Sequence, residues 1–564
     1  MTRILSLTTL ATIALCGLLP AAILQVEIRH TVAGQPLRLD SLRYEKAGDE
    51  VFSVSRLSYL VSEVALQQVD GSWYETQLDA AWIDAGKRRT AFQIEDVPTG
   101  KYRAIRFCIG LNEEQNDADP ASFPAGHPLN PAVSNLHWSW QGGYIFLALE
   151  GHYRISKERQ GFLMHFARAA NQTEINLPAK MGLNKVARVS LDFDLAAVLG
   201  SPHQIVFARD GESTHSREED SLAEMVRTNL PSAFRVQSIS MPESVLSASR
   251  KKPLYVPAQP EAYPLRIART FPMPQLPEDN PLLKGRVALG KAIFNDKKLS
   301  RTGMLSCASC HHTNKAFTDG KAFSVGVDGR VGTKNSMPLF NLAWKDKYFW
   351  DGRAPSLRDQ VLMPIESHQE MDENLDQVVS KFASDQDYAQ RFERAFGTPE
   401  VTSEKIALAL EAFLLTLTSY DSKFDRAMAG KAELTAKEKR GFELFMTEYE
   451  PRNGQYGADC FHCHGGALFS DHGFHHNGLS GTSELFATPS LRNVSLTAPY
   501  MHDGRFQTLE EVIAHYSSGV QRSDQLDPNL AKHPKEGLGL SVDDQAALVA
   551  FLESLTDPKY SSTQ

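Results

Sequence analysis

The most constraining feature of this chain is a short motif that occurs twice, as Cys307-Ala-Ser-Cys310-His311 and as Cys460-Phe-His-Cys463-His464. In a C-x-x-C-H motif the two thiols add to the vinyl groups of haem, and the histidine becomes the proximal iron ligand. A zinc knuckle or a redox-active C-x-x-C pair needs no histidine directly after the second cysteine. Two well-separated copies in one chain therefore predict two covalently bound haem c groups.

The remaining cysteines and the charge narrow the class of protein. Only Cys16 and Cys108 of the six cysteines lie outside the two motifs, so no disulfide framework is expected. Cys108 alternates with apolar residues over 105–109, which predicts a half-buried strand residue rather than a reactive thiol. The net charge of −9 is dispersed along the chain, and no nucleic-acid binding is expected.

The first 22 residues have the pattern of an export signal. Arg3 precedes an apolar run over 4–19, and small residues follow it. This run is shorter than the roughly 20 residues that a spanning helix needs, so we expect no membrane span after cleavage. Cys16 only weakly resembles a lipoprotein site, because the bulky Leu15 precedes it. Since covalent haem attachment takes place outside the cytoplasm, we expect a periplasmic protein.

A chain of 564 residues should form two or three domains. Residues 24–240 have strand character and predict an all-β sandwich; Trp138 and Trp140 would share one face if 137–149 form a strand. Residues 241–281 are rich in proline and predict a stiff linker. Residues 403–415 and 541–552 predict helices behind the N-cap serines Ser403 and Ser541. We expect two mainly α, cytochrome c-like lobes, 282–430 and 431–564, each with one haem motif.

Around the haem motifs the sequence resembles the bacterial di-haem cytochrome c peroxidases. The resemblance covers about residues 275–558 and rests on three segments, 289–296 (Leu-Gly-Lys-Ala-Ile-Phe-Asn-Asp), 349–353 (Phe-Trp-Asp-Gly-Arg) and 491–504. Within the family it is closer to the MauG and MbnH type, whose members oxidise tryptophan residues of a partner protein. The resemblance implies a haem-dependent oxidoreductase that acts on hydrogen peroxide.

The first haem, held by His311, is the expected peroxide site. The family's classical peroxidases have a distal histidine between the first motif and Trp350, but no histidine lies between His312 and Trp350 here. We therefore expect an open distal face, as catalysis requires. The resemblance implies that Gln360, Pro364 and Glu370, which follow Trp350 at the spacing typical of the family, are the distal glutamine, proline and glutamate.

In that pocket Glu370 would move a proton between the peroxide oxygens. Trp350 is expected between the haems, where its ring can relay an electron; as a simpler alternative it is a core tryptophan. The resemblance also implies a calcium ion between the lobes, bound by the Asn335 side chain and the carbonyls of Thr497 and Pro499. Such hard oxygen donors suit calcium.

The second haem, held by His464, is expected to have a sixth ligand. The family places this ligand at a fixed spacing after His502, with methionine in ordinary peroxidases and tyrosine in the MauG and MbnH type; here the residue is Tyr516. A phenolate is a hard donor that stabilises high-valent iron. His515 is the rival ligand, and Met501 is a weaker one.

The strand half resembles the MbnP family of periplasmic copper proteins. The matching segments are 26–30, 57–64, 128–130, 138–146 and 149–151, together with His165. In that family a tryptophan is oxidised to kynurenine and binds copper with histidines. The resemblance implies Trp138 or Trp140 as the modified residue and His30 and His165 as copper ligands, with His137 as a third candidate. By spacing alone, a Trp-x-Trp pair is more often core packing, and a strand histidine is more often a hydrogen-bonded residue.

The sequence is compatible with three functions. The first is a self-modifying protein, in which the peroxidase half oxidises a tryptophan of the β-domain and so creates a copper site. The second is a conventional peroxidase that detoxifies peroxide with electrons from a small redox protein. The third is a copper-binding or electron-transfer module without catalysis. Tyr516 and the missing distal histidine favour the first over the second, and Gln360, Pro364 and Glu370 disfavour the third.

Overall fold

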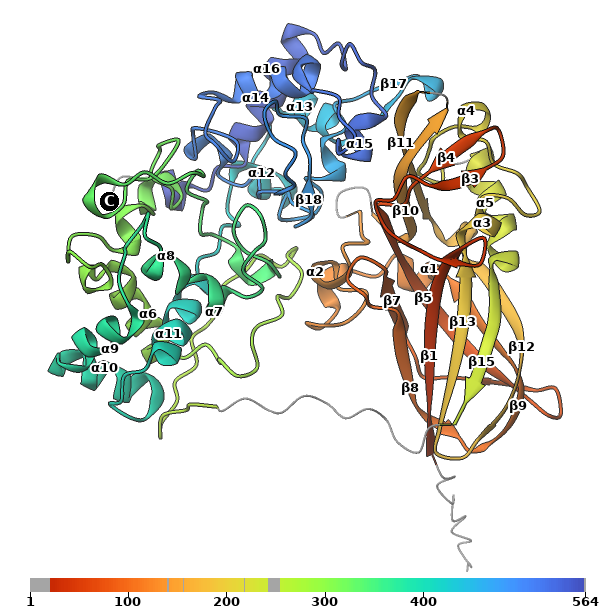
Figure 1. The fold of residues 1–564 in the computed structure, drawn as a ribbon, viewed down its shortest axis with the longest axis horizontal. Helices are drawn as coiled ribbons and strands as arrows, with labels where there is room; N and C mark the ends of the chain where they lie inside the picture. Colours follow the sequence, from red (N-terminus) through yellow and green to blue (C-terminus); the bar gives the residue numbers. More distant parts are fainter. Residues whose placement is uncertain (1–20, 139–141, 156, 218, 242–253, 562–564) are drawn as a thin grey trace, which may run out of the picture.

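The computed structural model describes residues 21–138, 142–155, 157–217, 219–241 and 254–561. It forms three bodies that are arranged as an arch, with the β-domain on one side, the second haem lobe at the top and the first haem lobe on the other side (Figure 1). Each body has its own hydrophobic core. The multidomain organisation predicted from the sequence is confirmed. Residues 1–20, which hold most of the predicted export signal, and Trp140 lie outside the described residues.

The β-domain consists of two sheets that share one core. The first sheet has the order β15 (Phe234–Ser240), β13 (Val186–Asp194), β1 (Ala21–Val32), β2 (Gln35–Pro36), and β8 (Ala91–Pro98) also pairs with β1. β1 and β13 run parallel, with Val26 opposite Val189. The second sheet has the order β12 (Thr173–Leu183), β9 (Gly100–Ile109), β5 (Arg56–Gln68), β10 (Ile145–Ile155), β11 (Glu158–Ala167), β14 (Ser213–Thr214). The ring of Phe193 packs 5.3 Å from that of Tyr59 and joins the sheets.

Shorter elements complete this domain. The strands β3 (Tyr44–Lys46), β4 (Glu50–Phe52), β6 (Trp73–Glu75) and β7 (Ala80–Asp84) extend the second sheet. The helices are α1 (Glu113–Asn116), α2 (Pro131–Ser134), α3 (Leu195–Val198), α4 (Phe207–Asp210) and α5 (Ser221–Ala233). Cys108 is a buried residue of β9, and burial raises the pKa of its thiol to about 12, as expected of an unreactive cysteine.

Trp138 lies outside the strand that the segment 137–149 contains. β10 begins only at Ile145, and Trp138 lies in the loop before it. Gly142 and Gly143 both have φ near +80°, a conformation that ends an extended strand. The Trp138 N–H donates to Gly143 O at 3.0 Å, and the Gly142 N–H donates to Trp138 O at 2.8 Å. Two backbone hydrogen bonds thus join Trp138 to the paired glycines, and the Trp138 side chain is half-buried.

Both haem lobes are helical. The first contains α6 (Lys284–Asn295), α7 (Leu357–Gln360), α8 (Met363–Glu366), α9 (Leu375–Ala383), α10 (Gln386–Phe396) and α11 (Ser403–Leu415). The second contains α12 (Lys423–Met428), α13 (Ala436–Met446), α14 (Leu509–Ala514), α15 (Pro528–Ala531), α16 (Val542–Ser554) and the short hairpins β16–β17 (Tyr449–Glu450, Gln455–Tyr456) and β18–β19 (Phe474–His475, Phe486–Ala487). The helix predicted over 403–415 is α11, although its N-cap is Thr402, and Ser541 caps α16 as predicted.

A close helix pair recurs in the two lobes. α6 packs on α11, where a Cβ at Gly290 would lie 1.9 Å from Ala409 O. α13 packs on α16 in the same way, where a Cβ at Gly441 would lie 1.9 Å from Ala547 O. Only glycine permits such a close approach of two helix backbones. The two lobes therefore share one construction, which their sequences do not reveal.

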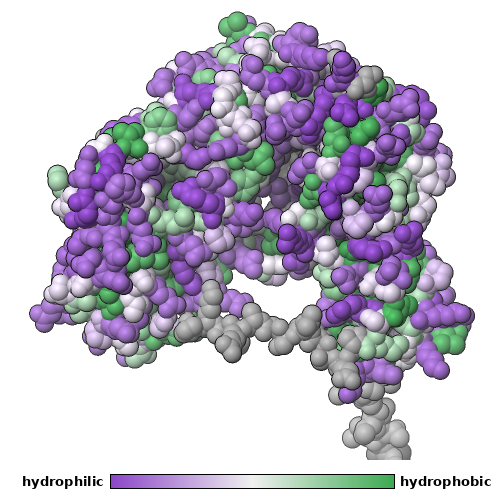
Figure 2. All heavy atoms as spheres, in the orientation of Figure 1, coloured by the Kyte–Doolittle hydropathy of each residue, from purple (hydrophilic) through white to green (hydrophobic). Residues whose placement is uncertain are grey.

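The lobes are also tied together by chain segments that leave their own lobe. Tyr560 in the C-terminal α17 (Pro558–Ser561) packs in the core of the first lobe, and its hydroxyl donates to Thr418 O at 3.0 Å. Phe271 of the proline-rich linker belongs to the same core. Figure 2 shows an open space between the β-domain and the first lobe, below the second lobe. None of the helices in the described part of the chain combines the length and apolar character that a membrane crossing requires.

Candidate haem sites and the domain junction

The first haem motif folds so that one nitrogen of its histidine is free for iron. Cys307 begins a short 3-10 turn (Cys307–Ser309), and both cysteines of the motif are unpaired. His311 Nδ1 lies 2.7 Å from Phe317 O, and Ser336 Oγ lies 3.4 Å from the same nitrogen. Because the carbonyl fixes the proton on Nδ1, Nε2 is left as the iron ligand.

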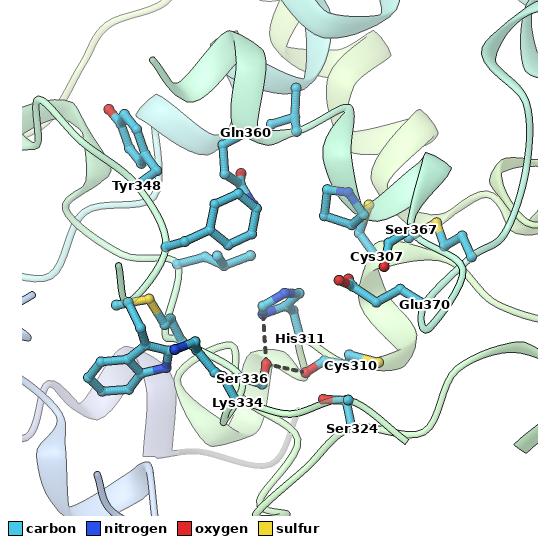
Figure 3. Close-up of a pocket in the computed structure, with 18 of the residues that line it drawn as sticks. Cys307, Cys310, His311, Ser324, Lys334, Ser336, Tyr348, Gln360, Ser367 and Glu370 are labelled. Atoms are coloured by element: carbon cyan, nitrogen blue, oxygen red, sulfur yellow. Dashed lines mark hydrogen bonds between the residues drawn. The ribbon is translucent and has the colours of Figure 1, made fainter. Parts of the chain in front are cut away.

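A cavity of about 420 Å³ lies over this motif, and its size and lining fit a haem c group. The predicted residues of the peroxide site all line it, namely Cys307, Cys310, His311, Trp350, Gln360, Pro364 and Glu370. In Figure 3 the Gln360 and Glu370 side chains point into the space above the His311 ring. Among the described residues that line the cavity, His311 is the only histidine. The described lining thus offers no second histidine as a distal ligand, and the open iron position stays a prediction.

Glu370 has the environment of a proton carrier. It is half-buried at the cavity wall, and burial raises the pKa of its carboxyl, although Ser367 and the charge of Arg353 oppose the shift. The backbone fixes its position, because the Val327 N–H donates to Glu370 O at 2.8 Å. A carboxyl with a raised pKa exchanges protons closer to neutral pH than an exposed glutamate does.

Trp350 lies where the two lobes meet. Its side chain is buried, and its Nε1 donates to Asn335 O at 2.8 Å. Its own carbonyl accepts from the Ala487 N–H of β19 in the second lobe at 2.7 Å. The Asn335 N–H in turn donates to His502 O at 2.7 Å. Trp350 thus lies at a hydrogen-bonded contact between the first cavity and the second lobe.

The residues predicted to bind calcium are near this same contact. Asn335 Nδ2 donates to Lys321 O at 2.7 Å. A Cβ at Gly504 would lie 2.5 Å from Ala322 Cα and 3.1 Å from Pro499 Cγ, so the loop that carries Thr497 and Pro499 packs on the segment next to Asn335. These three residues offer only oxygen donors, a set that fits calcium.

The second haem motif repeats the arrangement of the first. Cys460 begins a 3-10 turn (Cys460–His462), and Cys460 and Cys463 are unpaired. His464 Nδ1 lies 3.1 Å from Phe469 O, which again leaves Nε2 for iron. The residues present therefore fit a second covalently held haem.

Of the three candidate sixth ligands, Tyr516 and His515 lie in the same element. Tyr516 lies in a π-helical turn (His515–Gly519), an element that often marks functional sites. Burial raises the pKa of its phenol, and the Cys460 and Cys463 thiols are close enough to contribute. His515 Nε2 lies 3.0 Å from Asn477 O, and Met501 Sδ accepts from Asn477 Nδ2 at 3.6 Å. Asn477 therefore contacts all three candidates, and Tyr516 differs in that the Cys460 and Cys463 thiols also raise its pKa.

Trp138 lies at the junction between the β-domain and the second haem lobe. It shares a small cavity with Phe461 and His462, the two residues between the second pair of haem-binding cysteines. A larger cavity of about 360 Å³ is also lined by Trp138, Phe461 and His215. The ring of Trp138 lies 5.8 Å from that of His215, and the ring of His215 lies 5.2 Å from that of His462. The β-domain thus presents a tryptophan to the second haem motif.

A buried charge cluster holds this junction together. Glu448 accepts from His215 at 2.7 Å, and Lys532 Nζ lies 2.5 Å from Glu448 and 2.8 Å from Asp459. Burial would raise the pKa of Glu448, but His215 and Lys532 outweigh it and hold the pKa well below its usual range. Burial lowers the pKa of His215, although Glu448 opposes the shift.

The structure brings only some of the predicted copper ligands to Trp138. His137 and His165 line the small cavity with it, and burial lowers the pKa of each to about 4. His30 does not line that cavity: its Nε2 lies 3.0 Å from the Tyr59 hydroxyl, and its ring packs on Phe193.

Several residues of the junction were not predicted from the sequence. His215 and Glu448 have no motif around them, and only their spatial neighbours reveal them. His462 was visible as the third residue of the second motif, but that position can hold any residue without loss of haem attachment. The only sequence feature that could have indicated a role for His462 was the presence of a histidine directly before Cys463.

The helical half and the strand half of the chain match different families of known proteins. The profile described as "Di-haem cytochrome c peroxidase" matches residues 284–433, and the MbnP profile matches residues 21–216. "Methylamine utilization protein MauG" of Methylorubrum extorquens is 37% identical over 297 residues, which are 50% of this chain and 80% of that protein. "Cytochrome c551 peroxidase" of Pseudomonas aeruginosa is 32% identical over 302 residues, 49% of this chain and 80% of that protein.

Among solved structures, a "MauG-like protein associated with microbial copper homeostasis" is 32% identical. The match covers 53% of this chain and 99% of that one, with a TM-score of 0.47. The curated relatives therefore correspond to the haem half, and the MbnP profile accounts for most of the β-domain.

Proposed function

Because the chain belongs to the di-haem cytochrome c peroxidase family and carries an MbnP domain, we propose that it uses hydrogen peroxide to oxidise Trp138 of its own β-domain. The observation that carries this proposal is the position of Trp138, in a cavity lined by Phe461 and His462 of the second haem motif. When bound, the haem groups supply the redox chemistry, reducing peroxide and holding oxidising equivalents.

The protein's own residues prepare the peroxide site. His311 and His464 each present Nε2, because a backbone carbonyl holds Nδ1. Glu370 accepts a proton from one peroxide oxygen and returns it to the other, which then leaves as water. Gln360 and Pro364 line the same cavity and restrict how peroxide can lie there.

A short path leads from Trp138 to the second haem motif. The Trp138 ring is 5.8 Å from His215, whose ring is 6.3 Å from Phe461. An electron that leaves the indole therefore crosses only ring-to-ring contacts before it reaches the residues that flank Cys460 and Cys463. Trp350 continues the connection to the first cavity, through the contact between the lobes.

The chemistry of the modification balances with peroxide as the only oxidant. Two molecules of hydrogen peroxide are reduced to water while two oxygen atoms enter Trp138, which gives N-formylkynurenine. Hydrolysis then releases formate and leaves kynurenine. The new amine and carbonyl add donors suited to copper beside the imidazoles of His165 and His137, which line the same cavity.

The fusion explains why such a reaction is efficient. A tryptophan on the same chain as the oxidising centre meets it at a high effective concentration, without a diffusive encounter. The same proposal includes a periplasmic location and a calcium ion held by Asn335, Thr497 and Pro499. A small electron-donor protein would serve only a conventional peroxidase cycle.

Peptide mass mapping tests the proposal. Full-length protein with both haems is exposed to peroxide, and we expect the peptide with residues 138–140 to gain the mass of kynurenine at Trp138. Trp138→Phe should stay unmodified, whereas Trp140→Phe should still be oxidised; the peptide with Trp73, outside the junction, serves as the internal control. Rapid peroxide turnover with both tryptophans intact would instead identify a conventional detoxifying peroxidase.

A further inference from the structure

Three histidines from both sides of the domain junction converge on one point. His165 lies on β11, His215 directly follows β14, and His462 belongs to the second haem motif. One ring nitrogen from each lies within 4.8 Å of those of the other two. His165 Nδ1 is 3.2 Å from His215 Nε2, and the His165 and His462 rings are 5.4 Å apart.

Each of these rings is held from behind by a carboxylate. The pairs are His165 Nε2 with Glu150 Oε1 at 2.9 Å, His215 Nδ1 with Glu448 Oε2 at 2.7 Å, and His462 Nε2 with Glu448 Oε1 at 3.3 Å. His462 Nε2 also lies 2.9 Å from Asp459 Oδ1, as an ion-pair contact. Metal-binding histidines almost always donate their outer N–H to such a partner, which fixes the tautomer and the orientation of the ring. All three carboxylates are buried.

The two closest ring nitrogens are His165 Nδ1 and His215 Nε2, and they form a good hydrogen bond only if one of them carries a proton. The carboxylates keep a proton on the outer nitrogen of His165 and of His215, so both inner nitrogens carry lone pairs. Two acceptors face each other at 3.2 Å. A cation bound between them would satisfy both, in line with the rule that buried polar groups find partners.

We propose that His165, His215 and His462 bind a single copper ion, so that the haem lobe completes a site that begins in the β-domain. This inference rests on the proposed function for the identity of the metal, but it adds that the site is shared between the domains. Imidazole nitrogen suits copper and zinc. The three carboxylates behind the rings are also in direct contact with two permanent cations, Arg56 and Lys532.

A shared site couples the metal to the second haem motif. His462 is directly bonded to Cys463, and its ring stacks on Phe461 at 4.2 Å. Copper on His462 therefore changes the surroundings of the second haem and leaves the first unaffected. It also ties the two domains together, because the ligands come from both.

Copper(I) titration of the full-length protein with both haems tests the site. The titration is anaerobic, competes against a chromophoric copper(I) chelator, and uses protein that has not met peroxide and whose Trp138 is intact by mass. We expect one copper ion per chain. His215→Ala and His462→Ala should each weaken binding by about 100-fold or more, beyond what loss of a supporting residue usually costs.

His152→Ala is the matched control. His152 is also buried at this junction, with Nε2 2.6 Å from Leu526 O, but it is not part of the triad, so copper affinity should not change. Copper(I) should also shift the absorption of the low-spin haem, and His462→Ala should abolish that shift while its haem content stays at two.

Three results would overturn the inference. If His462→Ala binds copper(I) as the wild type does, the site is confined to the β-domain. If binding appears only after Trp138 is oxidised, the three imidazoles are not sufficient. If equimolar zinc(II) displaces the copper, the metal is wrong. Copper binding by the triad in a protein whose Trp138 stays intact after peroxide would refute only the proposed function.

Discussion

His215 of the β-domain donates to Glu448 of the second haem lobe across 2.7 Å, in a setting where both side chains are largely shielded from water. The same imidazole lies beside Trp138, with the two rings 5.8 Å apart. One contact therefore docks the domains and positions the tryptophan. Its strength comes from the buried charges behind it, above all those of Lys532 and Asp459.

Lys532→Met should destabilise the docked protein by about 3 kcal/mol, because it leaves Glu448 and Asp459 without their main counter-charge. Thermal unfolding measures the loss. Lys284→Met, which removes an exposed partner of Glu261, should cost less than about 1 kcal/mol. If both variants lose the same stability, the buried cluster contributes no more to stability than an exposed ion pair does.

The same cluster predicts the pH dependence of stability. Burial opposes the shifts, yet neighbouring charges hold the pKa of Glu448 and of Asp459 well below the usual range. A lowered pKa contributes stability above the unfolded value of about 4 and loses it as the pH falls through the folded value. Because Lys532→Met raises both pKa values, its acid-unfolding midpoint should move to higher pH than that of the wild type.

Glu370→Gln should slow peroxide turnover by about 100-fold or more, since a positioned general base contributes 10²–10⁴ in rate. Burial raises the pKa of Glu370 above 4.5. As the pH falls through this raised pKa the base becomes protonated, so the wild-type rate should already decrease at a pH above 4.5. Stopped-flow kinetics across pH check both points. Glu366→Gln changes an exposed glutamate of α8 and should leave the profile unchanged. An unaltered acid limb in Glu370→Gln would assign the base elsewhere.

Tyr516→Phe should keep two haems per chain but lose the low-spin signature of the second, because phenylalanine offers no ligand atom. Electron paramagnetic resonance and the pyridine haemochrome assay provide the two readings. His515→Ala is the comparison, since its Nε2 is engaged with Asn477 O. If His515→Ala removes the signature while Tyr516→Phe retains it, the ligand assignment is wrong.

Oxidation of Trp138 should be a first-order reaction whose rate does not depend on protein concentration, because donor and acceptor share one chain. Mixing Trp138→Phe chains, which can react with peroxide, with Glu370→Gln chains, which retain the tryptophan, should give little kynurenine by mass spectrometry. Efficient modification in this mixture would mean that the reaction takes place between chains.

Local spacing made the haem chemistry predictable. Thioether attachment and proximal ligation need only one short, continuous motif, so Cys307, Cys310 and His311 could be assigned without a fold. The distal residues Gln360 and Glu370 followed from family spacing, and the structure places both in the cavity over His311. The sequence left open whether 137–149 form a strand. In the structure β10 begins only at Ile145, after Gly142 and Gly143, which adopt positive φ.

The domain junction was decided by tertiary structure alone. His215 follows Trp138 only after several intervening strands, and His462 belongs to a different domain, so no periodicity or motif links the three. They meet because a docking surface forms only once each domain has folded, and because the buried Glu448 of the haem lobe is paired across it with His215 of the β-domain. Sequence spacing determined which residues hold haem; the packing of two folded surfaces determined which residues face Trp138.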